Sequence, residues 1–215
     1  MVAALYSCSA CPAQPSALQD IPPKTASAAD PNVTEFLPKN AKLIKESKVD
    51  FENNGVVAVV LAYASDTVPD VMTGVLVLRY GANGWAVKFE ESGSVTNGAG
   101  ASDAINIEKV RSSGGKEGAV VALKFSGAGT STDWHVLTSV TNKIVRLDPT
   151  GIRERVLKAR GYEFMGYNGV TVNGDAVIES LAGYSRGRAR CCPDRPSIAI
   201  TSRFTGTSIK LDSVK

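Results

Sequence analysis

The sequence predicts an all-β fold with one short helix, built from propeller-blade-like antiparallel sheet repeats. Short apolar, β-branched segments recur along its 215 residues, separated by turns rich in Gly, Asn and Asp. The pattern of residues 48–63 restarts near residue 109, about 60 residues later. We therefore expect two or three repeat units that form a partial or distorted β-propeller, and the alternative is a β-sandwich.

The composition makes several classes of function improbable. A hydrophobic content of 43% suits a globular core, and a formal net charge of +3 gives little reason to expect nucleic-acid binding. The chain has no run of eighteen apolar residues that could span a membrane. It has a single histidine, His135, which gives little support to zinc catalysis or to histidine acid–base chemistry.

The first unit is the clearest. Residues 56–63 are almost all apolar, which is typical of a strand covered on both faces. Two more strands are expected at 75–80 and 85–90, joined by an Asn-Gly hairpin turn. Residues 35–44, interrupted by Pro38, are expected to be an irregular lead-in, and residues 92–102 a loop.

The rest of the chain repeats this pattern around one helix. Residues 150–160 predict a helix that Thr150 caps, with Lys158 and Arg160 in the last turn, where they suit the helix dipole. The remaining expected strands are 118–125, 134–139, 143–147, 170–172, 176–181, 197–204 and 208–211.

The N-terminus predicts a membrane tether. A short apolar run ends at Cys8, and the following Ala-, Pro- and Ser-rich stretch cannot bury enough surface to fold. This arrangement resembles a bacterial lipoprotein, in which a small residue precedes the lipidated cysteine. No basic residue precedes Cys8, so either the start was trimmed or this is a disordered N-terminus. We expect a signal remnant and tether over residues 1–33 and one β-rich domain over 34–215.

A turn near the start of the domain could bind calcium. Asp50, Glu52 and Asn54 place oxygen atoms at alternating positions before Gly55. This order of turn and apolar strand resembles the FG-GAP type of propeller repeat, whose loops hold calcium. Leu61 stands where a bidentate Glu is expected, and the alternative is a tight turn between strands.

Another motif could carry hydrolase chemistry. Residues 183–187 read Gly-Tyr-Ser-Arg-Gly, which fits the G-x-S-x-G nucleophile pattern around Ser185. No histidine follows it, so a Gly/Ser loop is the favoured alternative. A hydrolase would use Ser185 or carboxylates such as Asp175 and Glu179.

The cysteines lie at the two ends of the chain. Cys191 and Cys192 are adjacent, and they could pair with each other or one of them with Cys11. Zinc binding that includes Cys8 and Cys11 is a further alternative. Three arginines precede the adjacent cysteine pair and could bind an anion or a phospholipid headgroup: Arg186, Arg188 and Arg190. The alternative is a solvated loop.

The C-terminal segment carries a further resemblance. Residues 189–211 read ARCCPDRPSIAITSRFTGTSIKL. They resemble the end of small bacterial envelope lipoproteins of the mycobacterial LppP/LprE group, where a Cys-Cys-Pro-Ser element precedes a last hairpin with a Trp-Asp-Gly turn. Here Asp194 replaces that Ser, and Phe204 begins the turn. The resemblance implies an exported lipoprotein and transfers no catalytic residue.

Together these observations predict a non-catalytic binding or scaffolding module in the cell envelope. It would face the periplasm, lipid-anchored or secreted, and would meet an envelope protein or ligand, with no nucleic acid and no required cofactor. The alternatives are a secreted hydrolase and a calcium-dependent adhesion module.

Overall fold

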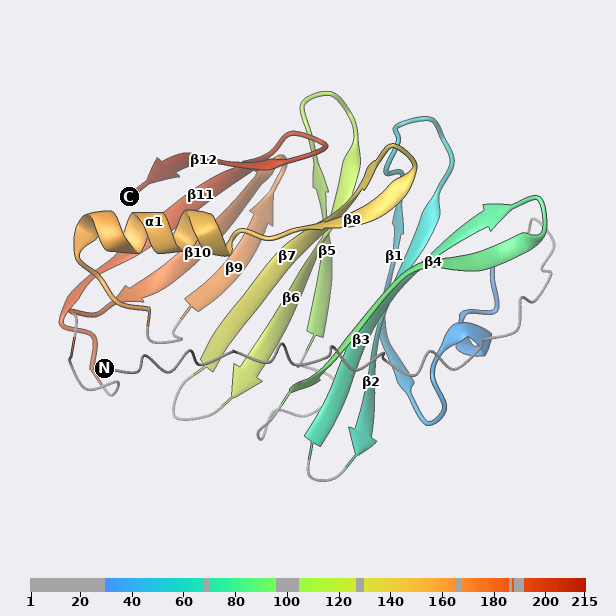
Figure 1. The fold of residues 1–215 in the computed structure, drawn as a ribbon, viewed down its shortest axis with the longest axis horizontal. Coiled ribbons are helices and arrows are strands. Elements are labelled where there is room, and N and C mark those ends of the chain that lie inside the picture. The colour runs from blue at the N-terminus through green and yellow to red at the C-terminus, as the bar shows by residue number, and fades with distance from the viewer. Residues whose placement is uncertain are drawn as a thin grey trace, which may run out of the picture.

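The fold consists of three four-stranded antiparallel sheets (Figure 1). The computed structural model describes residues 30–67, 70–95, 105–126, 130–164, 168–185, 187 and 192–215. Within each sheet the strands follow one another in chain order, which is the meander of a propeller blade. The predicted all-β, blade-like class is confirmed, with three units.

The elements have the following bounds. The first sheet contains β1 (Lys42–Val49), β2 (Ala58–Thr67), β3 (Asp70–Gly81) and β4 (Gly84–Val95). The second contains β5 (Ile105–Arg111), β6 (Glu117–Ser126), β7 (Thr130–Val140) and β8 (Lys143–Leu147). The third contains β9 (Asn168–Asn173), β10 (Ala176–Gly183), β11 (Arg195–Phe204) and β12 (Ile209–Val214). A 3-10 turn, η1 (Val33–Phe36), precedes the first sheet, and helix α1 (Thr150–Arg160) precedes the third.

The sheets stack face to face in chain order, with the second sheet in the middle (Figure 1). The first strands of neighbouring units contact each other, β1 with β5 and β5 with β9, as the inner strands of neighbouring blades do. The outer face of the first sheet packs on η1, and that of the third sheet packs on α1. Strand β2 is buried on both faces, as its apolar sequence predicts.

Strand β7 of the middle sheet contributes side chains to the hydrophobic cores on both faces of that sheet. Because successive side chains of a strand point to opposite faces, alternate residues of β7 enter different cores. Trp134 and Val136 pack against the third sheet, whereas Leu137 packs against the first. His135 lies on the same face as Leu137.

Turns at the ends of the strands also join the sheets. The Asp50 N–H donates to Glu117 Oε2 at 2.9 Å, and the Glu117 N–H donates to the Asp50 carbonyl at 3.2 Å. The Arg111 N–H donates to the carbonyl of Gly174 at 3.0 Å. The turn between the first two strands of a unit therefore hydrogen-bonds to the neighbouring unit.

Strands β1, β4 and β5 differ from the sequence prediction. The lead-in expected at 35–44 is η1 followed by the start of β1, and Val49 is the only fully buried residue of that charged strand. Strand β4 runs to Val95, so the first part of the loop expected at 92–102 belongs to a strand. Strand β5 forms after that range, where no strand was expected. Neither β1 nor β5 contains a long contiguous apolar run, so neither stands out from the sequence as a buried strand.

The helix has the predicted bounds but another cap. Thr150 is the first helical residue, and its N–H donates to Asp148 Oδ1 at 2.8 Å, so Asp148 supplies the capping oxygen. At the other end Gly161 adopts a left-handed φ of 66°, which ends the helix. The predicted tether lies almost wholly outside the described residues, and its boundary at residue 33 stays a prediction.

Candidate functional site

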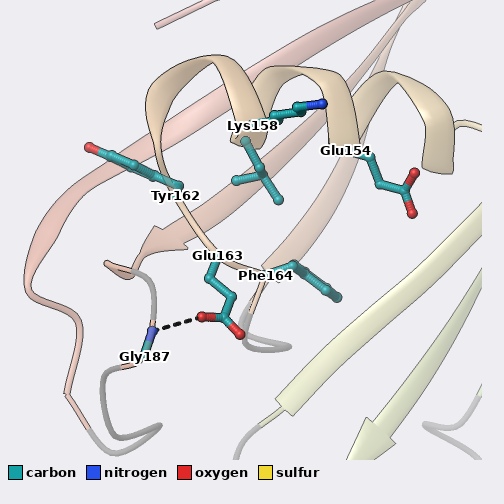
Figure 2. A pocket seen from close by; sticks show the side chains of 7 residues that line it. Glu154, Lys158, Tyr162, Glu163, Phe164 and Gly187 are labelled. Atoms are coloured by element: carbon teal, nitrogen blue, oxygen red, sulfur yellow. Dashed lines mark hydrogen bonds between the residues drawn. The ribbon is translucent and has the colours of Figure 1, made fainter.

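Helix α1 builds one wall of the candidate site. Its buried apolar residues, Ile152, Val156 and Leu157, recur at helical spacing and pack on the outer face of the third sheet. The chain then reverses at Gly161, where the Tyr162 N–H donates to the Leu157 carbonyl at 2.9 Å. The reversal brings the residues after the helix back under its last turns (Figure 2).

The segment after the helix forms the other wall. The Glu163 N–H donates to the carbonyl of Tyr184 at 2.9 Å, and Tyr162 forms an isolated bridge with Ser185. Figure 2 shows the Gly187 N–H donating to Glu163 Oε2, a distance of 3.1 Å. These bonds hold the segment beside the loop that follows β10.

An open groove lies between these two walls. It has a volume of about 680 Å³, within the range of ligand-binding pockets. Phe164 is 38% exposed there, and Glu154 and Lys158 stand above it on the helix (Figure 2). The groove residues are Glu154, Leu157, Lys158, Tyr162, Glu163, Phe164 and Gly187. The site therefore combines an apolar floor with charged groups at its rim.

A buried ion pair supports the floor. The Arg153 guanidinium carbon lies 4.3 Å from the centroid of the Phe164 ring, a cation–π contact. Arg153 Nη1 donates to Glu179 Oε1 at 2.9 Å, and Asn168 Nδ2 donates to the same oxygen at 2.7 Å. Asp133 lies 3.8 Å from Arg153 Nη2. The position of Phe164 thus depends on residues of the second and third sheets.

The residues of the predicted hydrolase have other partners. Ser185 Oγ accepts a hydrogen bond from Arg195 Nε at 2.7 Å, and the Ser185 N–H donates to Asp194 Oδ1 at 2.7 Å. Asp175 accepts two hydrogen bonds from Arg203. Glu179 belongs to the buried ion pair described above. The Ser185 hydroxyl oxygen is thus engaged by a guanidinium, which cannot accept its proton as a catalytic base would.

The oxygens of the predicted calcium loop point to protein groups. Asp50 accepts from the N–H groups of Asn54 and Gly55, at 3.2 and 2.8 Å, and Asn54 Oδ1 accepts from the Val56 N–H at 2.9 Å. Burial raises the pKa of Asp50, but these backbone N–H groups outweigh it and bring the pKa below its ordinary value. This pattern fits the tight-turn alternative.

The third residue of that loop, Glu52, faces the second sheet. It accepts a hydrogen bond from the buried Ser139 hydroxyl and lies 3.5 Å from Arg79 and 3.6 Å from Lys116. The Ser139 hydroxyl lowers the pKa of Glu52, burial opposes this, and the charges of Lys116 and Arg79 lower it further. Among the described residues, no group of three or more His, Cys, Asp or Glu side chains could hold a metal ion.

Several predicted site residues lie outside the described residues: Cys8, Cys11, Arg186, Arg188, Arg190 and Cys191. Cys192 is described and exposed. The lipidation, disulfide and anion-site hypotheses therefore stay predictions.

The sequence interpretation missed Arg153 and Phe164. One signal was present, because Arg153 follows Ile152 and lies on the buried side of the helix with Val156. A charged residue on an apolar helix face needs a buried partner, and that requirement points to a polar network. Nothing local to the sequence indicates that Phe164 lies under this arginine.

No known family model, curated protein or solved structure matches the chain. The helices in the described part of the chain include none that is long and apolar enough to cross a membrane.

Proposed function

We propose that this protein is an exported, membrane-tethered lipoprotein that acts as a non-catalytic binding module in the cell envelope. Its binding surface is the groove beside α1. The observation that carries this proposal is the half-exposed Phe164 ring, held in an open groove by the buried pair of Arg153 and Glu179. A fixed aromatic floor is typical of recognition surfaces, because binding then costs little side-chain entropy.

The chemistry of the groove favours one kind of partner. Its floor is apolar, so it takes an apolar side chain from a segment of an envelope protein. Among the described residues, its rim has two carboxylates, Glu154 and Glu163, against one ammonium group, Lys158. The two carboxylates of these described rim residues favour a partner segment that carries Lys or Arg next to the apolar residue.

The same observations weigh against the two alternatives. Ser185 is bound by Arg195, and the carboxylates of Asp175 and Glu179 are paired with arginines. The oxygens of Asp50 and Asn54 are engaged by the backbone of their own turn. These contacts support a binding module over a hydrolase or a calcium-dependent adhesion module.

Peptide selection tests the binding role. A random peptide library is selected against the immobilised full chain, and the enriched peptides are then measured by fluorescence anisotropy. We expect peptides with an apolar residue beside Lys or Arg, whose affinity falls at least about tenfold in Phe164→Ala. Tyr80→Ala is the matched control, because Tyr80 is similarly exposed, at 41%, on another sheet. Equal binding to both variants would overturn the proposal.

The intact mass of the protein from its native membrane fraction tests the tether. Cleavage before Cys8 with added acyl chains is the expected result. An unlipidated chain with Cys8 as an unmodified thiol would contradict it.

A further inference from the structure

A second polar site lies between the first and second sheets. His135 Nε2 on β7 is 3.5 Å from Glu91 Oε2 on β4. Both atoms are buried, and neither has a hydrogen-bond partner in the described part of the chain. His135 itself is 1% exposed. Two unpaired buried polar atoms that face each other are costly, so the arrangement calls for a ligand between them.

The space beside these atoms is small. A cavity of about 60 Å³ adjoins them, which is room for about two water molecules or for an ion with its water. Its walls include Ile105, Val121 and Leu123 from the second sheet, and Thr73 and Gly74 from the first. A site of this size suits water molecules or a single ion.

The separation of the two atoms fits a metal ion. Ligand atoms about 2.0–2.2 Å from a shared tetrahedral ion lie about 3.3–3.5 Å from each other. We propose that His135 Nε2 and Glu91 Oε2 bind one divalent transition-metal ion of the zinc class, with water as the remaining ligands. The imidazole nitrogen favours zinc-class ions over calcium and magnesium, which prefer all-oxygen sites.

The surroundings fix the carboxylate ligand. The other oxygen of Glu91 accepts a hydrogen bond from Arg146, as ligating carboxylates commonly accept one from an outer residue. Asp148 lies 3.7 Å from the same guanidinium and partly offsets its charge. With only two side-chain ligands, we expect weaker binding than in a four-ligand structural site.

The test uses the full chain with its cysteines alkylated, because thiolates would bind zinc themselves. His135 is the only histidine, so its ring nitrogen resonances in NMR report on this site alone. We expect Zn²⁺ to shift the Nε2 resonance at a stoichiometry of one ion per chain. Co²⁺ should give visible absorption bands that Zn²⁺ abolishes.

Two neighbouring glutamates provide matched variants. Glu91→Gln keeps the size of the side chain and should weaken Co²⁺ affinity at least about tenfold. Glu90→Gln alters the next residue of β4, which points to the opposite face, and should bind as the unsubstituted protein does. Ring resonances that stay fixed at millimolar Zn²⁺, or equal Co²⁺ binding by the two variants, would overturn the proposal. Neither outcome bears on the groove beside α1, which lies on the outer side of the third sheet.

Discussion

Arg153 Nη1 donates to Glu179 Oε1 at 2.9 Å, and both side chains are buried between α1 and the third sheet. The pair joins the helix to β10, and through Asn168 it also reaches the main chain of β7 at Thr132. Because the guanidinium also stacks on Phe164, one ion pair sets both the position of α1 and the floor of the groove.

Breaking this pair should be costly. Glu179→Ala leaves the Arg153 charge buried without its main partner, so we expect the free energy of unfolding to fall by about 3–5 kcal/mol. Urea denaturation monitored by circular dichroism measures the change. Asp212→Asn serves as the control, because the solvent-exposed contact of Asp212 with Arg203 should contribute little to stability.

Removing both charges should restore much of the loss. In the double variant Arg153→Met, Glu179→Leu, neither charge is left buried, so its stability should exceed that of Glu179→Ala. Its affinity for selected peptides should nevertheless be lower, because Phe164 loses the guanidinium beneath it. Stability that stays as low as in the single variant would contradict this account.

The stability of the metal-free protein should depend on the protonation of His135. Burial, with a further effect from the charge of Arg146, lowers the pKa of His135 to about 4 from an ordinary 6.5. The unfolded chain therefore binds a proton before the folded protein does as the pH falls below about 6.5. The free energy of unfolding should decrease by about 3 kcal/mol between pH 6.5 and pH 4.

Urea titrations in the presence of a chelator measure this slope. The window between pH 5 and 6.5 is the informative one, because Asp and Glu carboxylates titrate mainly below it. A His135→Gln variant should lose the slope in this window even where its stability is lower throughout. A slope that persists in the variant would assign the effect to other groups.

The contribution of Asp50 to stability should not depend on calcium. Asp50→Ala removes the acceptors of the Asn54 and Gly55 N–H groups, so we expect a loss of about 1 kcal/mol. The melting temperature in calcium and in a chelator should fall by the same amount. A loss that appears only with calcium present would instead support the calcium-loop hypothesis.

Gly183 should tolerate no side chain. A Cβ atom there would lie 2.3 Å from the Pro196 carbonyl oxygen and 2.6 Å from that of Arg195, so the backbone of β11 would have to move. We expect Gly183→Ala to cost at least about 2 kcal/mol. Gly93→Ala is the matched strand control, since nothing lies within 4 Å of its added Cβ, and its stability should be unchanged or slightly higher.

Much of the fold was predictable because its strands follow simple local rules. The apolar run of β2 and the Asn-Gly turns at Asn83 and Asn173 mark strands and hairpins without knowledge of the rest of the chain. Strand β1 was not predictable in this way. Its charged residues stay partly exposed, and its pairing with β2 rather than its composition makes it a strand.

The candidate sites depended on contacts distant in sequence. From the sequence alone, Glu179 is a carboxylate that could serve in catalysis. In the structure it is paired with Arg153, which lies 26 residues earlier in the chain. From the sequence alone, His135 is an isolated histidine. In the structure it lies on β7 of the second sheet and faces Glu91 on β4 of the first sheet. Local patterns identify strands, whereas these pairs exist only once the sheets have stacked.

The hydrogen bonds between turns of neighbouring units have a consequence for synthesis on the ribosome. Asp50 and Glu117 are 67 residues apart, so at roughly 5–20 residues per second about 3–13 s pass between the synthesis of the Asp50 turn and that of its partner. During that interval the face of β2 that packs on the second sheet in the folded protein is not covered by it. The nascent first unit is therefore the point at which a holding chaperone would contribute most to the yield of folded protein.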